Sequence, residues 1–203
     1  QGPTIDSLET KIAQKVGTKY AIAVSNGTAA LHAACFAAGI GPGDEVIVPT
    51  LTFTASANCV LFCGGTPILC DIDPTTLAID LNEAERKITN KTKAIIAVDF
   101  AGHSAEWDKL RLIAKKYNLI LIDDAAHALG AKYKGSPIGS QANLTTFSFH
   151  PVKAITTGEG GMIVTDNKEY ADKMKLFRNH GITKPSNLQP ATCSLPGWYQ
   201  EMV

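Results

Sequence analysis

The sequence predicts an α/β protein in which helices cover both faces of a mostly parallel sheet. Short, continuous apolar segments recur along the chain, and they alternate with longer segments whose apolar residues return every three or four positions. Continuous apolar segments indicate strands buried on both faces, whereas the longer period indicates amphipathic helices. In addition, polar segments follow three of the strands, and ligands in such sheets bind at the carboxyl ends of the strands.

The N-terminal part of the chain begins with a helix, because apolar residues recur at spacings of three and four across 5–16. The apolar segment 21–24 is a predicted strand, which Ser25-Asn26-Gly27-Thr28 ends. The alanine-rich helix 29–38 follows, and the glycines and proline of 39–43 end it. Buried strands are then expected at 45–48 and 66–70, with a helix at 55–63 between them.

The C-terminal part continues the alternation. Apolar residues predict strands at 94–99, 119–122, 144–149 and 161–165. Helices are expected at 81–89, 104–117 and 168–178, and a turn near Gly135. The helix 104–117 is expected to direct Leu110 and Ile113 inward.

Composition and charge are those of an ordinary soluble globular protein. Of the 203 residues, 45% are hydrophobic and 19% are charged, enough chain for one sizeable domain. Lysine plus arginine equals aspartate plus glutamate, 19 against 19, so no overall charge favours nucleic acid or an anionic membrane. No apolar segment approaches the roughly 20 residues that span a bilayer, and the N-terminus does not read as a signal peptide. We therefore expect a cytoplasmic protein with neither a nucleic-acid nor a membrane partner.

The five cysteines agree with a reducing compartment. They are scattered at 35, 59, 63, 70 and 193 without a Cys-x-x-Cys pair. Cys59, Cys63 and Cys70 have no histidine near them in the sequence, so core packing explains them better than a metal cluster. We expect no metal site.

Lys153 is the residue that most constrains the chemistry. It follows a predicted strand in the segment 146–153, Thr-Phe-Ser-Phe-His-Pro-Val-Lys, and lies shortly before a glycine-rich segment. A lysine amine condenses with an aldehyde to a Schiff base when part of it is neutral, which burial favours. A solvated lysine without chemistry is the alternative, and other residues must decide between the two.

A phosphate site is indicated at Ser25-Asn26-Gly27-Thr28. A strand, a glycine-containing turn and a helix start leave backbone N–H groups free, and the helix dipole favours an anion there. Thr28 adds a hydroxyl donor, and Ser148, five residues before Lys153, is a candidate for a second one. The alternative is that these small polar residues only cap the helix.

Asp124 is the candidate partner of a protonated pyridine nitrogen. It follows an apolar strand in the segment 121–127, Leu-Ile-Asp-Asp-Ala-Ala-His, and a carboxylate there would make a bound ring an electron sink. Strand alternation lets only one of Asp123 and Asp124 face the site. His127 lies one helical turn from Asp124 and could share its face. In the alternative, both aspartates cap a following helix and His127 is a packing residue.

Phe53 follows a strand at the same edge of the sheet and is a candidate to stack on a flat ring, with core packing as the alternative. Gly158, Gly160 and Gly161 permit sharp backbone bends next to a ligand. Phosphate donors, a carboxylate for a ring nitrogen, a stacking aromatic and a reactive lysine together describe one ligand. That ligand is pyridoxal 5′-phosphate (PLP).

With these residues in view, the chain resembles the DegT/DnrJ/StrS family of PLP-dependent sugar aminotransferases over essentially all 203 residues. The most specific segment is 147–153, Phe-Ser-Phe-His-Pro-Val-Lys. The other segments that carry the resemblance are 1–3 (Gln-Gly-Pro), 25–31 (Ser-Asn-Gly-Thr-Ala-Ala-Leu), 39–47 (Gly-Ile-Gly-Pro-Gly-Asp-Glu-Val-Ile), 52–58 (Thr-Phe-Thr-Ala-Ser-Ala-Asn), 123–131 (Asp-Asp-Ala-Ala-His-Ala-Leu-Gly-Ala) and 178–182 (Arg-Asn-His-Gly-Ile).

The resemblance implies the large domain of a fold type I PLP-dependent aminotransferase. In that family pattern, Lys153 forms the Schiff base with the cofactor. Asp124 pairs with the pyridine nitrogen, and His127 approaches the 3-hydroxyl of the ring. Residues 1–203 are expected to be this one domain, truncated at both ends.

The same resemblance implies that Gly27, Thr28 and Ser148 hold the phosphate and that Phe53 covers the ring. Family members are homodimers whose active sites are shared between the subunits. Their small C-terminal domain is expected to lie beyond residue 203 and is missing from this sequence.

The substrates implied are glutamate, as amino donor, and a nucleotide-linked keto sugar. The segments 98–104, 155–161 and 198–202 look most like the branch of the family that aminates C4 of a UDP-linked 4-keto-6-deoxy-N-acetylhexosamine in pseudaminic-acid synthesis. Three alternatives stay open. They are a sugar dehydratase of the family, in which histidine replaces the lysine, a non-catalytic regulatory relative, and a nucleotide-binding α/β domain without PLP.

Overall fold

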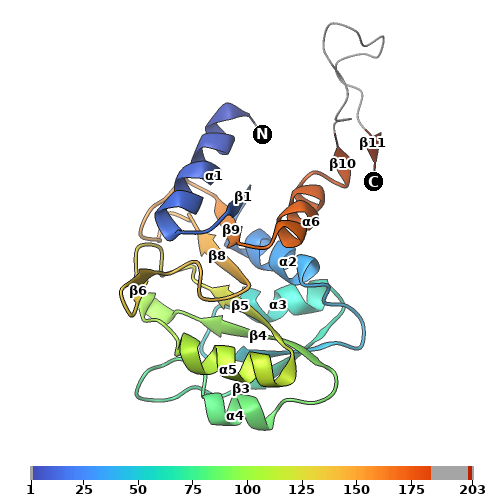
Figure 1. Ribbon diagram of the computed structural model, residues 1–203, viewed down its shortest axis with the longest axis vertical. Coiled ribbons are helices and arrows are strands. Elements are labelled where there is room, and N and C mark those ends of the chain that lie inside the picture. The colour runs from blue at the N-terminus through green and yellow to red at the C-terminus, as the bar shows by residue number, and fades with distance from the viewer. Residues whose placement is uncertain (1, 184–200, 203) are drawn as a thin grey trace, which may run out of the picture.

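The computed structural model describes residues 2–183 and 201–202, and its centre is a seven-stranded sheet (Figure 1). The strand order is β1-β9-β8-β5-β4-β2-β3. The strands are β1 (Tyr20–Val24), β2 (Glu45–Pro49), β3 (Thr66–Cys70), β4 (Thr92–Val98), β5 (Ile120–Asp124), β8 (Leu144–Ser148) and β9 (Gly161–Thr165). Neighbouring strands are parallel except around β9, which runs antiparallel to both β8 and β1. The predicted mostly parallel sheet is confirmed.

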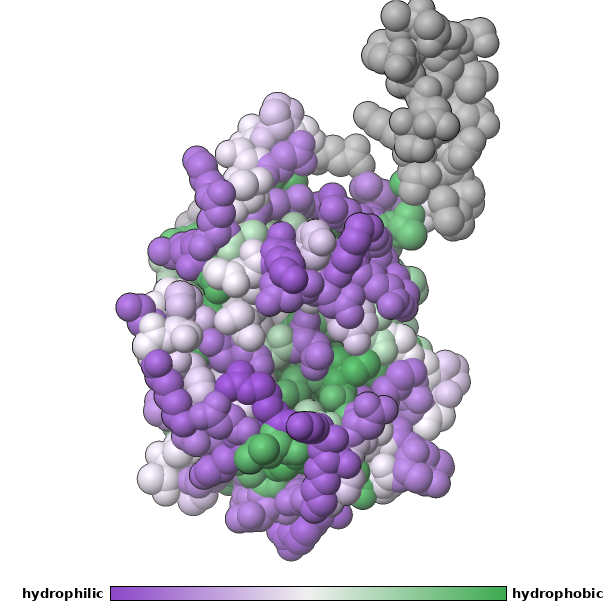
Figure 2. Space-filling model, viewed as in Figure 1, coloured by the Kyte–Doolittle hydropathy of each residue, from purple (hydrophilic) through white to green (hydrophobic). Residues whose placement is uncertain are grey.

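Helices cover both faces of the sheet, as predicted. One hydrophobic core includes residues of α1 (Pro3–Val16), α4 (Leu81–Arg86) and α5 (Trp107–Tyr117). The other includes residues of α2 (Gly27–Ala37), α3 (Ala55–Phe62) and α6 (Lys168–Arg178). Along β4, Ile95 belongs to the first core and Ile96 to the second, because successive strand residues point to opposite faces. Polar residues cover most of the outer face shown in Figure 2, with apolar residues gathered near its middle.

Two predicted helices are longer than the observed ones. The helix expected at 104–117 begins only at Trp107, after a 3-10 turn at Phe100–Gly102. The N–H of Ala105 donates to the carboxylate of Asp99 at 2.8 Å, which holds the preceding segment outside the helix. The helix expected at 81–89 ends at Arg86.

The helix that the capping alternative places after Asp124 is absent. Residues 125–131 form successive turns, in which Ala128 donates to the carbonyl of Ala125 and Ala131 to that of Ala128. Asp124 and His127 therefore do not share a helix face, and the interpretation that the aspartates cap a helix is also wrong. The turns bring His127 toward the cavity by another route.

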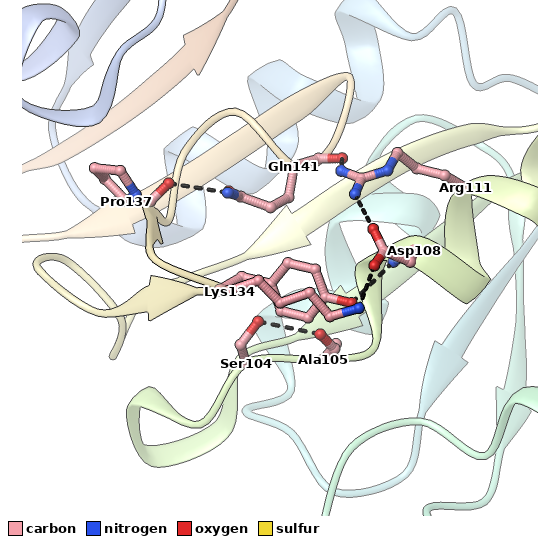
Figure 3. Close-up of polar contacts among 8 residues, drawn as sticks. Ser104, Ala105, Asp108, Arg111, Lys134, Pro137 and Gln141 are labelled. Atoms are coloured by element: carbon pink, nitrogen blue, oxygen red, sulfur yellow. Dashed lines mark hydrogen bonds and ion pairs between the residues drawn. The ribbon is translucent and has the colours of Figure 1, made fainter.

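A small hairpin, β6 (Lys132–Tyr133) and β7 (Ser136–Pro137), forms at the turn predicted near Gly135. Its Lys134 contacts Asp108 at the start of α5, and Arg111 of the same helix donates to Asp108 at 2.5 Å (Figure 3). The side-chain amide of Gln141 donates to the carbonyl of Pro137 at 2.9 Å. These polar contacts join the hairpin to α5 at the surface. A second short pair is β10 (Ile182–Thr183) with β11 (Glu201–Met202).

Cys59 and Cys70 are fully buried and Cys63 is half-buried, which supports core packing for these cysteines. Within residues 2–183 and 201–202, no group of His, Cys, Asp and Glu side chains could hold a metal ion. In the same described part of the chain, no helix has the length and apolar character needed to cross a membrane. Cys193 and residues 198–200, part of one segment used above for the substrate prediction, lie outside the described residues.

Candidate active site

A cavity of about 490 Å³ opens at the carboxyl ends of the central strands. The structure brings all seven residues predicted from the sequence to its wall, although they come from separate segments of the chain. They are Gly27, Thr28, Phe53, Asp124, His127, Ser148 and Lys153. Parallel strands end at one edge of a sheet, which is why distant polar segments meet there.

The start of α2 forms one side of this cavity. Asn26 caps the helix, because its side-chain oxygen accepts from the N–H of Ala29 at 2.8 Å. The N–H groups of Gly27 and Thr28 remain without an intrahelical acceptor, as in the first turn of any helix. A Cβ atom on residue 27 would lie 2.9 Å from the Cβ of the buried Ser148, so glycine is needed for this close approach. Capping by Asn26 thus leaves the N–H groups of Gly27 and Thr28 free, so the two interpretations of this segment do not exclude each other.

Asp124 ends β5 and is only 5% exposed. Its Oδ2 accepts from the hydroxyl of Ser56 at 2.6 Å, and its Oδ1 accepts from the N–H of Ala126 at 3.3 Å. Burial raises the pKa of Asp124, while these hydrogen bonds and the nearby His127 and Lys153 oppose the rise. A buried carboxylate in this position is suited to a cationic partner inside the cavity.

Asp123 does not line the cavity, so strand alternation separates the two neighbours as expected. It is fully buried, and its Oδ2 accepts from the hydroxyl of Thr145 at 3.4 Å. Burial, with the negative charges of Asp99 and Asp124 nearby, raises the pKa of Asp123 well above its usual range.

His127 lies on the exposed side of the cavity, where the N–H of Ala101 donates to its Nδ1 at 3.3 Å. That contact places the proton of the neutral imidazole on Nε2. Burial lowers the pKa of His127, which favours the neutral form, and its ring lies edge-on to Phe100. His127 can therefore donate one hydrogen bond from Nε2.

Lys153 lies in a loop that is closed on itself by backbone contacts. Its N–H donates to the carbonyl of His150 at 2.9 Å, and the N–H of Phe149 donates to the carbonyl of Gly160 at 2.8 Å. The hydroxyl of Thr156 also donates to the carbonyl of Phe149 at 2.9 Å. These contacts fix the backbone that carries the Lys153 amine at the cavity wall.

Phe53 is 74% exposed, so the interpretation that it packs in the core is wrong. Phe53 lines the cavity two residues before α3 begins, and its exposed ring is available to cover a ligand.

Sequence reasoning missed several residues that contact the predicted ones. Ser56 and Thr52 connect to Asp124, Phe100 lies against His127, and Glu159 lines the cavity. Only one sequence signal pointed toward them: Thr52 and Ser56 are four residues apart, a spacing at which side chains meet at the start of a helix.

This sheet, with a lysine, a buried carboxylate and a helix start around one cavity, defines the α/β fold of PLP-dependent aminotransferases. The chain belongs to the DegT/DnrJ/EryC1/StrS aminotransferase family, whose model matches residues 1–199. It is 50% identical over 181 residues to GDP-perosamine synthase of Caulobacter vibrioides, an alignment that covers 89% of this chain and 49% of that protein.

Two solved structures show the same fold. PseC of Helicobacter pylori, an aminotransferase of pseudaminic-acid biosynthesis, matches with a TM-score of 0.89 and 33% identity, over 100% of this chain and 52% of PseC. Spr1654 of Streptococcus pneumoniae in its PLP form matches with a TM-score of 0.88 and 33% identity, over 100% of this chain and 54% of that one. The chain thus spans about half the length of the relatives it matches.

The cofactor is pyridoxal 5′-phosphate, as predicted, which removes the alternative of a domain without PLP. The residues present fit this group. Gly27 lets Ser148 lie close to the start of α2, where free backbone N–H groups suit an anion, and Asp124 supplies a buried negative charge for a protonated ring nitrogen. The Lys153 amine and the exposed Phe53 ring complete a set that matches the aldehyde and the flat face of the cofactor.

Proposed function

We propose that the protein containing this chain transfers an amino group from glutamate to a nucleotide-linked keto sugar. The observation that carries the proposal is the meeting of Lys153, Asp124 and the α2 start around one cavity. The chain's membership of a sugar aminotransferase family supports it. A family dehydratase has histidine in place of the lysine, so Lys153 disfavours that alternative. The complete set of site residues disfavours a regulatory relative.

Each site residue has a role in this proposal. Gly27, Thr28 and Ser148 would bind the phosphate through N–H and hydroxyl donors, and Phe53 would cover one face of the ring.

When bound, PLP supplies an aldehyde that takes up the amino group and a ring that accepts electrons. Asp124 would hold the proton of the ring nitrogen by its negative charge. His127 would donate from Nε2 to the 3-hydroxyl oxygen of the ring. Lys153 would be the point of covalent attachment, and its Nζ would also act as the base that accepts and returns a proton.

Two acceptor sugars are candidates. The segments 98–104 and 155–161 favour a UDP-linked 4-keto-6-deoxy-N-acetylhexosamine, the acceptor of UDP-4-amino-4,6-dideoxy-N-acetyl-β-L-altrosamine transaminase in pseudaminic-acid synthesis. Against this, the 50% identity to a protein named GDP-perosamine synthase favours a GDP-linked sugar, and the identity to PseC is lower at 33%. The nucleotide therefore has to be decided by assay.

Three further points belong to the proposal. Residues 1–203 are the PLP-binding large domain of a longer chain, the protein acts as a homodimer with shared active sites, and it works in the cytoplasm. The exposed Phe53 at the cavity supports a site that a second subunit completes.

The test uses the full chain as the cell makes it. With PLP it should show an absorbance band at roughly 410–430 nm, and borohydride should then label Lys153 irreversibly. Product formation from glutamate is compared for UDP-linked and GDP-linked 4-keto-6-deoxy sugars. Lys153→Ala should abolish turnover, whereas Lys168→Ala, an exposed lysine on α6, should not change it. Normal turnover by Lys153→Ala, or an unlabelled Lys153, would refute the proposal.

A further inference from the structure

Ser56 lies in the first turn of α3 and is fully buried, yet it contacts the cavity carboxylate. Its Oγ donates to Oδ2 of Asp124 at 2.6 Å, and the Oγ1 of Thr52 lies 2.6 Å from that same Oγ. Hydroxyl hydrogen bonds of this length to a carboxylate are among the strong ones in proteins. Because Thr52 lines the cavity, the three side chains form a continuous chain from the cavity wall to Asp124.

The direction of this chain follows from the number of protons. Ser56 has one hydroxyl proton, and an ionised carboxylate can only accept. Ser56 therefore donates to Asp124, and Thr52 must donate to Ser56. Two hydroxyl dipoles in series thus point toward the negative charge, and each strengthens the other.

Two other buried acids, Asp99 and Asp123, interact electrostatically with Asp124. Asp99, just after β4, accepts from the N–H of Ala105, and the nearby indole N–H of Trp107 favours its charge, but its Oδ2 makes no hydrogen bond of good geometry with the described residues. Asp123, on the same strand as Asp124, accepts only the 3.4 Å contact from Thr145, and its Oδ1 is likewise without a described partner.

The hydrogen bonds therefore distinguish Asp124 from its neighbours. The titratable groups around Asp124 are Asp99, Asp123, His127 and Lys153, and burial raises the pKa of all three aspartates. Of the three acids, only Asp124 has both carboxylate oxygens engaged by donors within the described structure, and the shorter contact comes from Ser56. Charge placed on Asp124 is thus better stabilised than charge placed on Asp99 or Asp123.

We propose that Ser56, supported by Thr52, is a positioning residue that keeps Asp124 ionised and oriented toward the cofactor. The inference rests on the proposed function, because it assigns these hydroxyls to the residue that would face the ring nitrogen. It adds two residues to the site that act through Asp124 and not by contact with the reacting atoms.

The test measures the dissociation constant of PLP at several pH values for the full chain and its variants. Ser56→Ala should weaken PLP binding about ten-fold at neutral pH, the effect of losing one hydrogen bond to a charged group. The loss should grow as the pH falls, because Asp124 without Ser56 takes up a proton at a higher pH. Ser56→Thr keeps the hydroxyl and should restore binding, and Thr52→Val should show a smaller loss of the same kind.

Thr165→Val is the matched control. Thr165 is also buried and its hydroxyl also donates, at 2.7 Å to the carbonyl of Asn143, but it lies at the opposite edge of the sheet. It should leave PLP binding unchanged at every pH. If Ser56→Ala does not fold, Ser56→Cys keeps the size with a weaker donor and should shift the pH dependence in the same direction.

The outcomes separate the two proposals. Wild-type PLP affinity in Ser56→Ala, or a loss of equal size at every pH, would overturn the positioning role while leaving the aminotransferase proposal intact. A wild-type protein that binds no PLP would overturn the proposed function itself.

Discussion

Asp108 at the surface and Asp124 at the cavity are the same residue type in opposite surroundings. Asp108 contacts Lys134 and Arg111 (Figure 3), and the hydrogen bonds from Lys134 and Arg111 lower its pKa to about 2. Asp124 and its buried neighbours have raised pKa values, because burial disfavours their charge. Surface ion pairs are screened by water and contribute little, whereas a charge in the interior is costly and persists only with specific partners. The contacts of Asp108 join the hairpin to α5 at the surface, whereas the buried Asp124 is held by its partners at the cavity, as its proposed role requires.

The largest expected effect comes from removing the cavity charge. Asp124→Asn should lower turnover by about a hundred- to a thousand-fold, because an electrostatic stabilisation made in the transition state is lost. Steady-state kinetics of the full chain with glutamate measures it. Asp108→Asn, the matched change at the surface, should leave turnover unchanged. Equal rates for Asp124→Asn and the wild type would remove Asp124 from the site and end the comparison.

An effect of similar free energy, on stability instead of rate, is expected at Asp99, whose pKa burial raises from 3.8 to about 7. Since the folded state holds this proton more tightly than the unfolded state, stability is lost as the pH rises from about 4 through about 7. At about 1.4 kcal/mol per pKa unit, Asp99→Asn should be more stable than the wild type above that range, by a difference on the order of 4 kcal/mol.

Urea unfolding of Asp99→Asn and the wild type at pH values on both sides of this range measures the difference. Asp108→Asn should show the opposite sign, because a lowered pKa stabilises the ionised form: it should be less stable than the wild type at neutral pH. That deficit should vanish as the pH falls toward about 2. Parallel pH profiles for Asp99→Asn and the wild type would show that Asp99 is already ionised in the folded protein.

A smaller effect is expected where Gly27 and Ser148 meet at the cavity. Gly27→Ala places a Cβ atom 2.9 Å from the Cβ of Ser148. Each Cβ atom is attached directly to the backbone, so neither can move away without a shift of the main chain. PLP affinity should fall at least about ten-fold, because the helix start shifts away from its anion site. Gly41→Ala is the control, since a Cβ there meets no atom within 4 Å. Unchanged PLP affinity in Gly27→Ala would place the phosphate elsewhere.

The smallest effect, on thermal stability, is expected for the surface contacts of Asp108 with Lys134 and Arg111. Lys134→Ala removes one exposed partner of Asp108, and the melting temperature should change by less than about 2 °C. The change should disappear at about 1 M salt, where surface charges are screened. A larger or salt-independent change, measured by thermal unfolding, would mean that the hairpin contact stabilises the fold more than other surface pairs do.

Much of the fold could be predicted, because its signals are local. The continuous apolar segments gave the main strands within one or two residues at most ends, and the alternating helices followed from their period. The seven predicted site residues also meet at one cavity, since each ends or follows a strand or begins a helix at the same sheet edge. Their roles stay predictions until the variants are measured.

The prediction of α5 failed where a specific hydrogen bond overrides the apolar period. The carboxylate of Asp99 accepts from the N–H of Ala105 and delays the start of α5, and turns stand where the capping alternative placed a helix after Asp124. Phe53 is apolar and follows a strand, and its exposure at the cavity removes only the alternative that it packs in the core. The spacing of apolar residues does not show that an N–H will donate to a carboxylate six residues away. Nor does it show whether an aromatic ring will be exposed at a cavity.

The sequence by itself determined the class of fold, the order of its elements and the residue types suited to PLP, because apolar period and short motifs are properties of neighbouring residues. Only the tertiary structure decided that β9 runs antiparallel between β1 and β8. It also decided which hydroxyl serves Asp124. Ser56 and Asp124 are 68 residues apart, and their contact depends on how α3 packs against the end of β5. Burial and hydrogen-bond partners, which set the charge of an acid, arise from such long-range packing and cannot be read from the residues beside it.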